Sequence, residues 1–109
     1  MADTLKVLSQ SLPAAGALTN LYTVPSLTST VVSSLIICNE GSTATTFRVS
    51  IAPAGAADAL SQYIYYDVPL AANDTFIFTG GISLATTGVV RVRSASGLVA
   101  FSLFGVEVT

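Results

Sequence analysis

Hydrophobic and polar residues alternate with a period of two along most of this chain, in short segments separated by turn-forming residues. The segment Thr45–Ala52 shows the alternation most clearly, with Phe47, Val49 and Ile51 on one face and polar residues between them. This is the period of a strand that buries one face. The preceding segment, Thr30–Cys38, is apolar on both faces towards its end, so we expect it to lie centrally in a sheet, covered on two sides. The short polar run between the two segments predicts that they form a hairpin, around which the rest of the chain is organised.

The rest of the chain predicts further short strands at close, regular spacing, with no amphipathic helix. One stretch, Pro53–Ala59, has the length of a helical turn, but its Pro and Gly favour a surface loop. This pattern is typical of a small antiparallel β-sandwich or jelly roll of about eight strands. We expect one domain over residues 1–109, with an N-terminal edge strand or arm within residues 1–19. The further predicted strands are Leu5–Leu12, Thr19–Val24, Gln62–Val68, Thr75–Thr79, Ile82–Leu84, Val89–Ser94 and Leu98–Val108.

The final segment, Leu98–Val108, is apolar on both faces. Only one face of an antiparallel sandwich strand normally meets the core. We therefore expect Val99, Phe101 and Leu103, which share a face with Glu107, to contact a partner molecule. The alternative is that a loop of the same chain folds over them.

The composition supports association. Hydrophobic residues make up 51% of the chain and charged residues 9%, against about 25% charged residues in ordinary globular domains. A chain of 109 residues cannot bury so many apolar side chains, and monomers seldom expose large apolar patches. We expect a homo-oligomer, with a trimer favoured.

The residue types present argue against several kinds of site. The chain has no histidine, which removes the commonest general base and metal ligand. Its single cysteine, Cys38, rules out an internal disulfide and cysteine-based metal sites, and we expect it to be buried as a small hydrophobe. The acidic residues are scattered singly, so we expect no catalytic, metal-binding or cofactor-binding residues.

Two classes of partner are also disfavoured. Acidic residues outnumber basic ones by six to four, which argues against binding to nucleic acid. No apolar run approaches the roughly 20 residues that a transmembrane helix needs, so we expect no membrane partner.

A run of tyrosines has two interpretations. Tyr63, Tyr65 and Tyr66 combine apolar rings with polar tips, which suits subunit interfaces and sugar-binding platforms alike. The neighbouring Gln62 and Asp67 are compatible with a sugar site. We favour core or interface packing and count the three tyrosines as candidate interface residues.

Short motifs spread over the chain from Lys6 onwards carry a family resemblance. They are Leu21-Tyr22-Thr23-Val24-Pro25, Ile37-Cys38-Asn39, Ala44-Thr45-Thr46-Phe47-Arg48-Val49, Pro53-Ala54-Gly55, Tyr65-Tyr66-Asp67-Val68-Pro69, Ala72-Asn73-Asp74-Thr75, Val89-Val90-Arg91-Val92 and Phe101-Ser102-Leu103-Phe104-Gly105. In combination they resemble short all-β virion proteins that are encoded in the structural modules of tailed bacteriophages, including cyanophages. The resemblance implies a non-enzymatic part of a virion, assembled in the host cytoplasm.

Within that class, the resemblance implies three possible roles. The first is a capsid decoration, or cement, protein that clamps neighbouring subunits of the major capsid protein through many weak contacts repeated by symmetry. The second is a tail or baseplate adaptor. The third is a fibre-tip component that binds host glycans. Aromatic residues exposed on one open face would favour the third role, and aromatic residues buried between copies would favour the first two.

Overall fold

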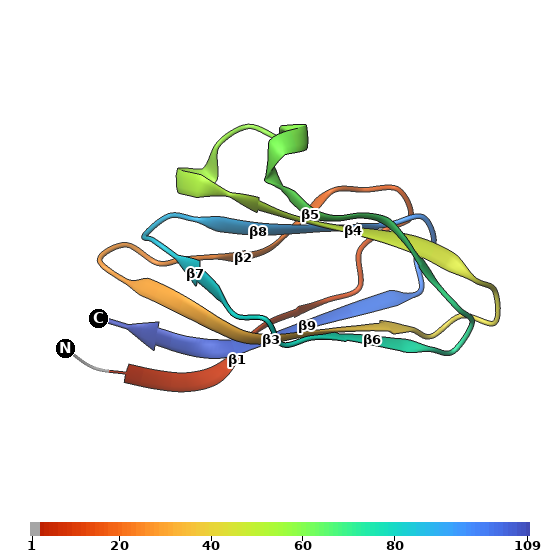
Figure 1. Ribbon diagram of the computed structural model, residues 1–109, viewed down its shortest axis with the longest axis horizontal. Coiled ribbons are helices and arrows are strands. Elements are labelled where there is room, and N and C mark those ends of the chain that lie inside the picture. The colour runs from red at the N-terminus through yellow and green to blue at the C-terminus, as the bar shows by residue number, and fades with distance from the viewer. Residues whose placement is uncertain (1–2) are drawn as a thin grey trace.

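The computed structural model describes residues 3–109, in which nine strands form two antiparallel sheets packed face to face (Figure 1). The predicted all-β sandwich is therefore confirmed. Two single 3-10 turns, η1 (Pro53–Gly55) and η2 (Leu60–Gln62), lie in the exposed segment between the fourth and fifth strands. The strands are β1 (Asp3–Ser11), β2 (Thr19–Thr23), β3 (Ser29–Asn39), β4 (Thr45–Ala52), β5 (Tyr63–Leu70), β6 (Thr75–Phe78), β7 (Ile82–Leu84), β8 (Val89–Ser94) and β9 (Val99–Val108).

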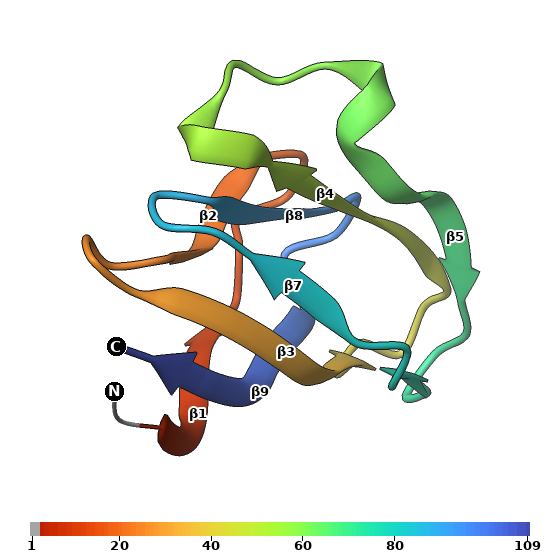
Figure 2. The same cartoon turned by 60° about the vertical axis from the view of Figure 1, so that its left-hand side comes forward.

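The strands pair in a nested order. Sheet A has the order β1-β9-β3-β6, with β7 also paired to β3, and sheet B has the order β2-β8-β4-β5. Thus β1 pairs with β9, β2 with β8, β3 with β6 and β7, and β4 with β5. Because β6 and β7 lie one after the other along β3, they act as one interrupted strand (Figure 2). A long hairpin folded over on itself in this way is a jelly roll of eight strands.

The predicted hairpin of the third and fourth strands is wrong. β3 belongs to sheet A and β4 to sheet B, so the segment between them crosses from one sheet to the other. The buried side chain of Asn39 fixes this crossing, because its Nδ2 donates to the carbonyls of Thr43 (3.0 Å) and Ala71 (3.1 Å). Its Oδ1 accepts from the backbone N–H of Gly41 at 3.0 Å. The two strands therefore face each other across the core instead of sharing hydrogen bonds.

Other features of the predicted strands are correct. β3 lies centrally in sheet A, between β9 and the β6/β7 edge. In β8, Val90 and Val92 are buried and the two arginines point outwards. β1 is an edge strand of sheet A, as expected for residues 1–19; Met1 and Ala2 lie outside the described residues.

The core lies between the sheets around Phe47. Its ring centroid is 5.4 Å from that of Phe76, 5.8 Å from that of Tyr65 and 6.5 Å from that of Phe101. These partners come from strands of both sheets, so Phe47 connects the two layers. The buried apolar residues around it are Leu21, Tyr22, Val24, Val32, Leu35, Ile37, Val49, Leu70, Leu84, Val90, Val92, Val99, Phe101 and Leu103.

Candidate assembly interface

The two faces of the final strand, β9, point in the directions opposite to those predicted: the face expected to contact a partner is the one that meets the core. Val99, Phe101 and Leu103 are each 0% exposed and belong to the core between the sheets, so their expected contact with a partner is wrong. They are covered by the opposite sheet, and not by a loop. The prediction took this face as the outer one, although its charged member, Glu107, is itself buried.

Two groups bond directly to the buried Glu107 carboxylate, and a third bonds to one of these two. The ammonium of Lys6 lies 2.7 Å from Oε1, and the hydroxyl of Tyr22 donates to Oε2. The hydroxyl of Thr30 bonds to the same Tyr22 oxygen at 2.9 Å. Hydrogen bonds lower the pKa of Glu107, the one from Lys6 having the larger effect and the one from Tyr22 the smaller. Burial raises the pKa of Tyr22 to about 12, and the hydrogen bond to Glu107 adds to this effect. This cluster joins β1, β3 and β9 of sheet A to β2 of sheet B.

With that face turned inwards, the other face of β9 becomes part of a large apolar surface, the outer face of sheet A. Strand register places residues of β1, β3, β6 and β7 on the same side. Leu5 is 80% exposed and Ile77 is 61% exposed. Among the described residues that strand register places on this face, Asp3 alone is charged, at the margin, and Glu40 follows β3 at the opposite end. The residues of this face are Asp3, Leu5, Val7, Gln10, Ser29, Val31, Ser34, Ile36, Cys38, Thr75, Ile77, Ser83, Ala100, Ser102, Phe104, Val106 and Val108.

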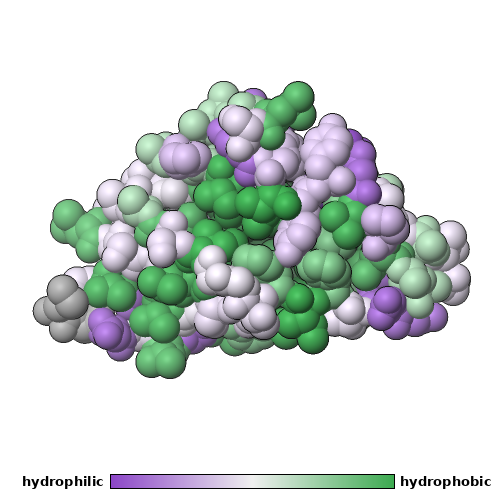
Figure 3. All heavy atoms as spheres, in the orientation of Figure 1, coloured by the Kyte–Doolittle hydropathy of each residue, from purple (hydrophilic) through white to green (hydrophobic). Residues whose placement is uncertain are grey.

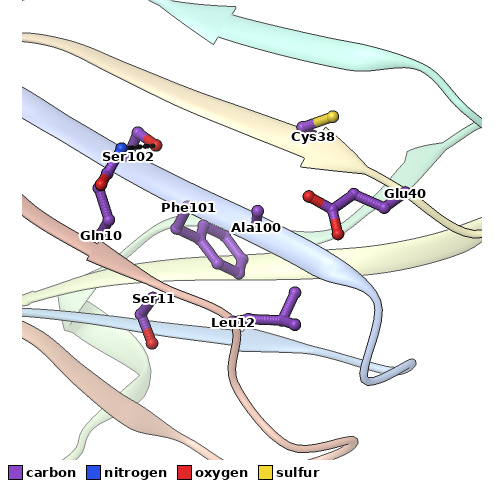
Figure 4. Close-up of a pocket in the computed structure, with 8 residues that line it drawn as sticks. All are labelled: Gln10, Ser11, Leu12, Cys38, Glu40, Ala100, Phe101 and Ser102. Atoms are coloured by element: carbon purple, nitrogen blue, oxygen red, sulfur yellow. Dashed lines mark hydrogen bonds between the residues drawn. The ribbon is translucent and has the colours of Figure 1, made fainter.

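One end of this face is hollowed around Cys38 and Ala100 (Figure 4). The hollow has a volume of about 500 Å³. Gln10 borders it and donates a hydrogen bond to the hydroxyl of Ser102 (3.3 Å). Cys38 is only partly buried, so the expectation that it would be a core residue is wrong. Small side chains at Ala100 and Ser102 leave the thiol accessible, and within residues 3–109 no second layer covers the outer face of β3.

The outer side of sheet B has a different character. Arg48 makes two hydrogen bonds to the carboxylate of Asp67, from Nε at 2.6 Å and from Nη2 at 3.0 Å, and these bonds lower the pKa of Asp67. Arg91 donates to Oδ1 of Asn20 (3.1 Å) and to the carbonyl of Ala56 (2.9 Å). The arginines of the sheet B surface are therefore internally paired, in contrast to the outer face of sheet A, although β5 also exposes Ile64 and Tyr66.

The three tyrosines do not form one patch. Tyr65 packs against the edge of the core, next to Phe47. Tyr63 and Tyr66 pack edge to face beside sheet B, with centroids 5.2 Å apart, and the hydroxyl of Tyr63 donates to Asp58. Tyr66 is 50% exposed, but the guanidinium of Arg48 lies 4.0 Å from its ring centroid and covers one face of the ring. This arrangement leaves no tyrosine presenting both faces of its ring to solvent, as an open sugar platform would.

A second apolar region lies at the open edge between the sheets. Hydrophobic atoms fill the middle of that edge in Figure 3. A cleft of about 370 Å³ occurs there, without a charged residue in its lining of Ile51, Pro53, Ala54, Ser83, Leu84, Ala85, Thr86 and Gly88.

The first hollow is lined by one thiol and one carboxylate, those of Cys38 and Glu40, and the lining of the second has neither. Within residues 3–109, no three side chains of His, Cys, Asp or Glu lie close enough together to hold a metal ion. The same residues contain no helix that is long and apolar enough to cross a membrane.

The comparisons with known proteins add no assignment: the chain matches no protein-family model, and no curated protein is significantly similar to it. Sequence reasoning missed Leu5, Val7, Ile36 and Ile77 as members of one surface, because only strand register brings them together. For Phe104 a signal existed in the sequence, because it stands on the second apolar face of the final strand.

Proposed function

We propose that this protein is a non-enzymatic structural component of a bacteriophage virion, and that it acts as a capsid decoration protein which reinforces the shell by clamping neighbouring capsid subunits. The observation that carries the proposal is the apolar outer face of sheet A, whose described strand residues include only one charged side chain, at the margin. A face of this kind on a small jelly roll suits permanent assembly better than a freely soluble existence. The resemblance of the sequence motifs to small phage virion proteins supports the same role.

The engagement of three of the six acidic residues supports a structural role. Glu107 is engaged by Lys6 and Tyr22, Asp67 by Arg48, and Asp58 by the hydroxyl of Tyr63. Carboxylates used as general acids or bases instead stand in clefts where a substrate reaches them. Here the three carboxylates serve to hold strands and loops together. Glu40 does line a hollow, but its lining contains no histidine and no second carboxylate.

A tail or baseplate adaptor would use the same apolar surface and is the second structural candidate. Glycan binding at a fibre tip has weaker support, because Tyr66, the most exposed of the three tyrosines, has one ring face covered by Arg48. A glycan array with the purified protein tests that role directly. Specific binding that is lost in Tyr66→Ala would favour it over decoration.

The decoration role is tested with capsid shells of the encoding phage assembled without this protein. Added protein should co-sediment with the shells at a fixed stoichiometry and raise the temperature at which they rupture. Ile77→Asp, on the outer face of sheet A, should weaken both effects, whereas Thr46→Asp, on the outer side of sheet B, should leave them unchanged. Absence of the protein from purified virions by mass spectrometry would contradict the proposal, and its location on tails by electron microscopy would favour the adaptor.

A further inference from the structure

We propose that the outer face of sheet A packs against the outer face of sheet A in a second copy of this chain, around a two-fold axis that lies in the plane of the interface. This inference names the partner of the surface on which the proposed function rests, so a decorating dimer would contact the shell through surfaces other than this face. It requires only that the surface is an assembly surface, whatever particle the protein belongs to.

The size of the face matches what a stable dimer needs. Sheet A is four strands wide, counting β6 and β7 as one, and its longest strands have ten or eleven residues. At about 4.8 Å between strands and about 3.3 Å per residue, the face measures roughly 19 by 33 Å, or about 600 Å² in flat projection. The relief of the side chains makes its accessible area larger. Stable interfaces bury about 800 Å² on each partner, so one complete face is of the required size.

The charge distribution favours self-contact on this face in particular. In a two-fold interface the same patch is used by both copies, so a charged patch would bring like charges together. Among the described strand residues of the outer face of sheet A, only Asp3 is charged, at its margin, and Glu40 lines the hollow at the opposite end. Sheet B, in contrast, carries Arg48, Arg91 and Arg93 on its outer side, and self-contact there would place arginines against arginines.

The spacing of the hollow and Phe104 along β9 also suits a two-fold contact. Ala100 and Cys38 lie in one row of the sheet and border the hollow, whereas Phe104 lies four residues further along β9. Ser102 lies halfway between Ala100 and Phe104. A two-fold axis that runs across the strands, along the row of Ser102, places Phe104 of each copy over the hollow of the other. Ile36 and Ile77 share the row of Ser102 and would then meet their own copies at the axis.

The natural Cys38 thiol provides the first test. Light scattering of the wild-type protein should give twice the chain mass of 11.1 kDa, and alkylation of Cys38 should slow as protein concentration rises and the monomer fraction falls. Ile77→Asp should give the monomer mass and a Cys38 that reacts at a rate independent of concentration. The matched control, Thr46→Asp, should behave like the wild type. Circular dichroism confirms that each variant is folded, and Val7→Asp replaces Ile77→Asp if that variant is not.

Chemical crosslinking tests the geometry. In a Cys38→Ser background, Ile36→Cys should give a covalent dimer with a short bis-maleimide reagent, because residue 36 meets its own copy at the axis across facing sheets that pack about 10 Å apart, a distance too long for a direct disulfide. Asn20→Cys in the same background, on sheet B, should remain monomeric. A wild-type monomer or trimer in solution, or a Cys38 reaction rate that does not depend on concentration, would overturn the inference. A dimeric protein that is absent from virions would refute the proposed function alone, and a monomer present in virions would refute the dimer alone.

Discussion

Truncation of Phe47 to alanine tests the assignment of the core. The ring is 1% exposed and stands between the sheets, with aromatic neighbours Tyr65, Phe76 and Phe101. Burying a phenylalanine side chain stabilises a fold by about 1.5–3 kcal/mol through removal of its surface from water. The cavity left behind and the lost aromatic pairs add to this, so that Phe→Ala substitutions in cores cost about 3–5 kcal/mol. We expect a loss of about 4 kcal/mol, a large part of the 5–15 kcal/mol that typically stabilises a domain.

Urea unfolding followed by circular dichroism measures this loss. The experiment is best performed in the Ile77→Asp background, because self-association would make the apparent stability depend on protein concentration. Phe104→Ala is the matched control: the residue type is the same, but this ring lies half-buried on the outer face of sheet A. It should cost less than about 1.5 kcal/mol in the monomer, since only part of its surface is removed from water on folding. Equal losses of unfolding free energy for the two variants, with an unchanged dependence of that free energy on urea concentration, would show that Phe47 does not occupy the core position described.

Two further predictions concern the contacts of β9. Gly105→Ala should destabilise the fold by about 1–3 kcal/mol or more, because an added Cβ would lie 2.3 Å from the backbone carbonyl oxygen of Val31. Thermal melts measure this loss. Gly97→Ala is the control that should be tolerated, because its Cβ would lie 3.6 Å from the nearest atom. Glu107→Gln should lower stability at pH 7, but the difference from the wild type should shrink on acidification. The pKa of Glu107 is lowered in the folded state, so its stabilising effect is present above the ordinary value of 4.5 and is lost as pH falls through the lower folded value. A difference that stays constant from pH 7 to pH 3 in urea titrations would contradict the role given to Lys6 and Tyr22.

The positions of the strands could be predicted from the sequence because they depend on local patterns. The alternation around Phe47 and Val49 and the turn residues between segments place nearly every strand within a few residues of its observed bounds. The partners of the strands depend on contacts distant in sequence. A polar turn such as the one after Asn39 serves equally well for a hairpin or for a crossing between sheets, and the deciding bonds to Thr43 and Ala71 are not encoded in the turn pattern itself.

The sequence placed the candidate interface on the correct strand, β9, but on its wrong face, again because the deciding contacts are distant in sequence. Glu107 shares a face with Val99, Phe101 and Leu103, and a carboxylate normally marks the solvent side of a strand. Lys6 and Tyr22 offset the cost of burying it, and they come from strands about a hundred and 85 residues away in the chain. No pattern within the final strand could reveal these partners, so its two apolar faces could be recognised while their directions could not.

The asymmetry between the sheets explains how so apolar a chain can remain specific in its associations. The composition requires that hydrophobic side chains reach the surface, but it does not determine where. If they were scattered, each would contribute little to any one partner and would promote indiscriminate contacts. The fold instead gathers Leu5, Val7, Ile36, Ile77 and Phe104 on one face, and keeps the paired arginines on the opposite sheet. Other exposed apolar side chains, such as Leu27, Leu60 and Leu98, lie singly in segments between the strands, outside this face. The outer face of sheet A is therefore the place where apolar side chains can act together on a single partner.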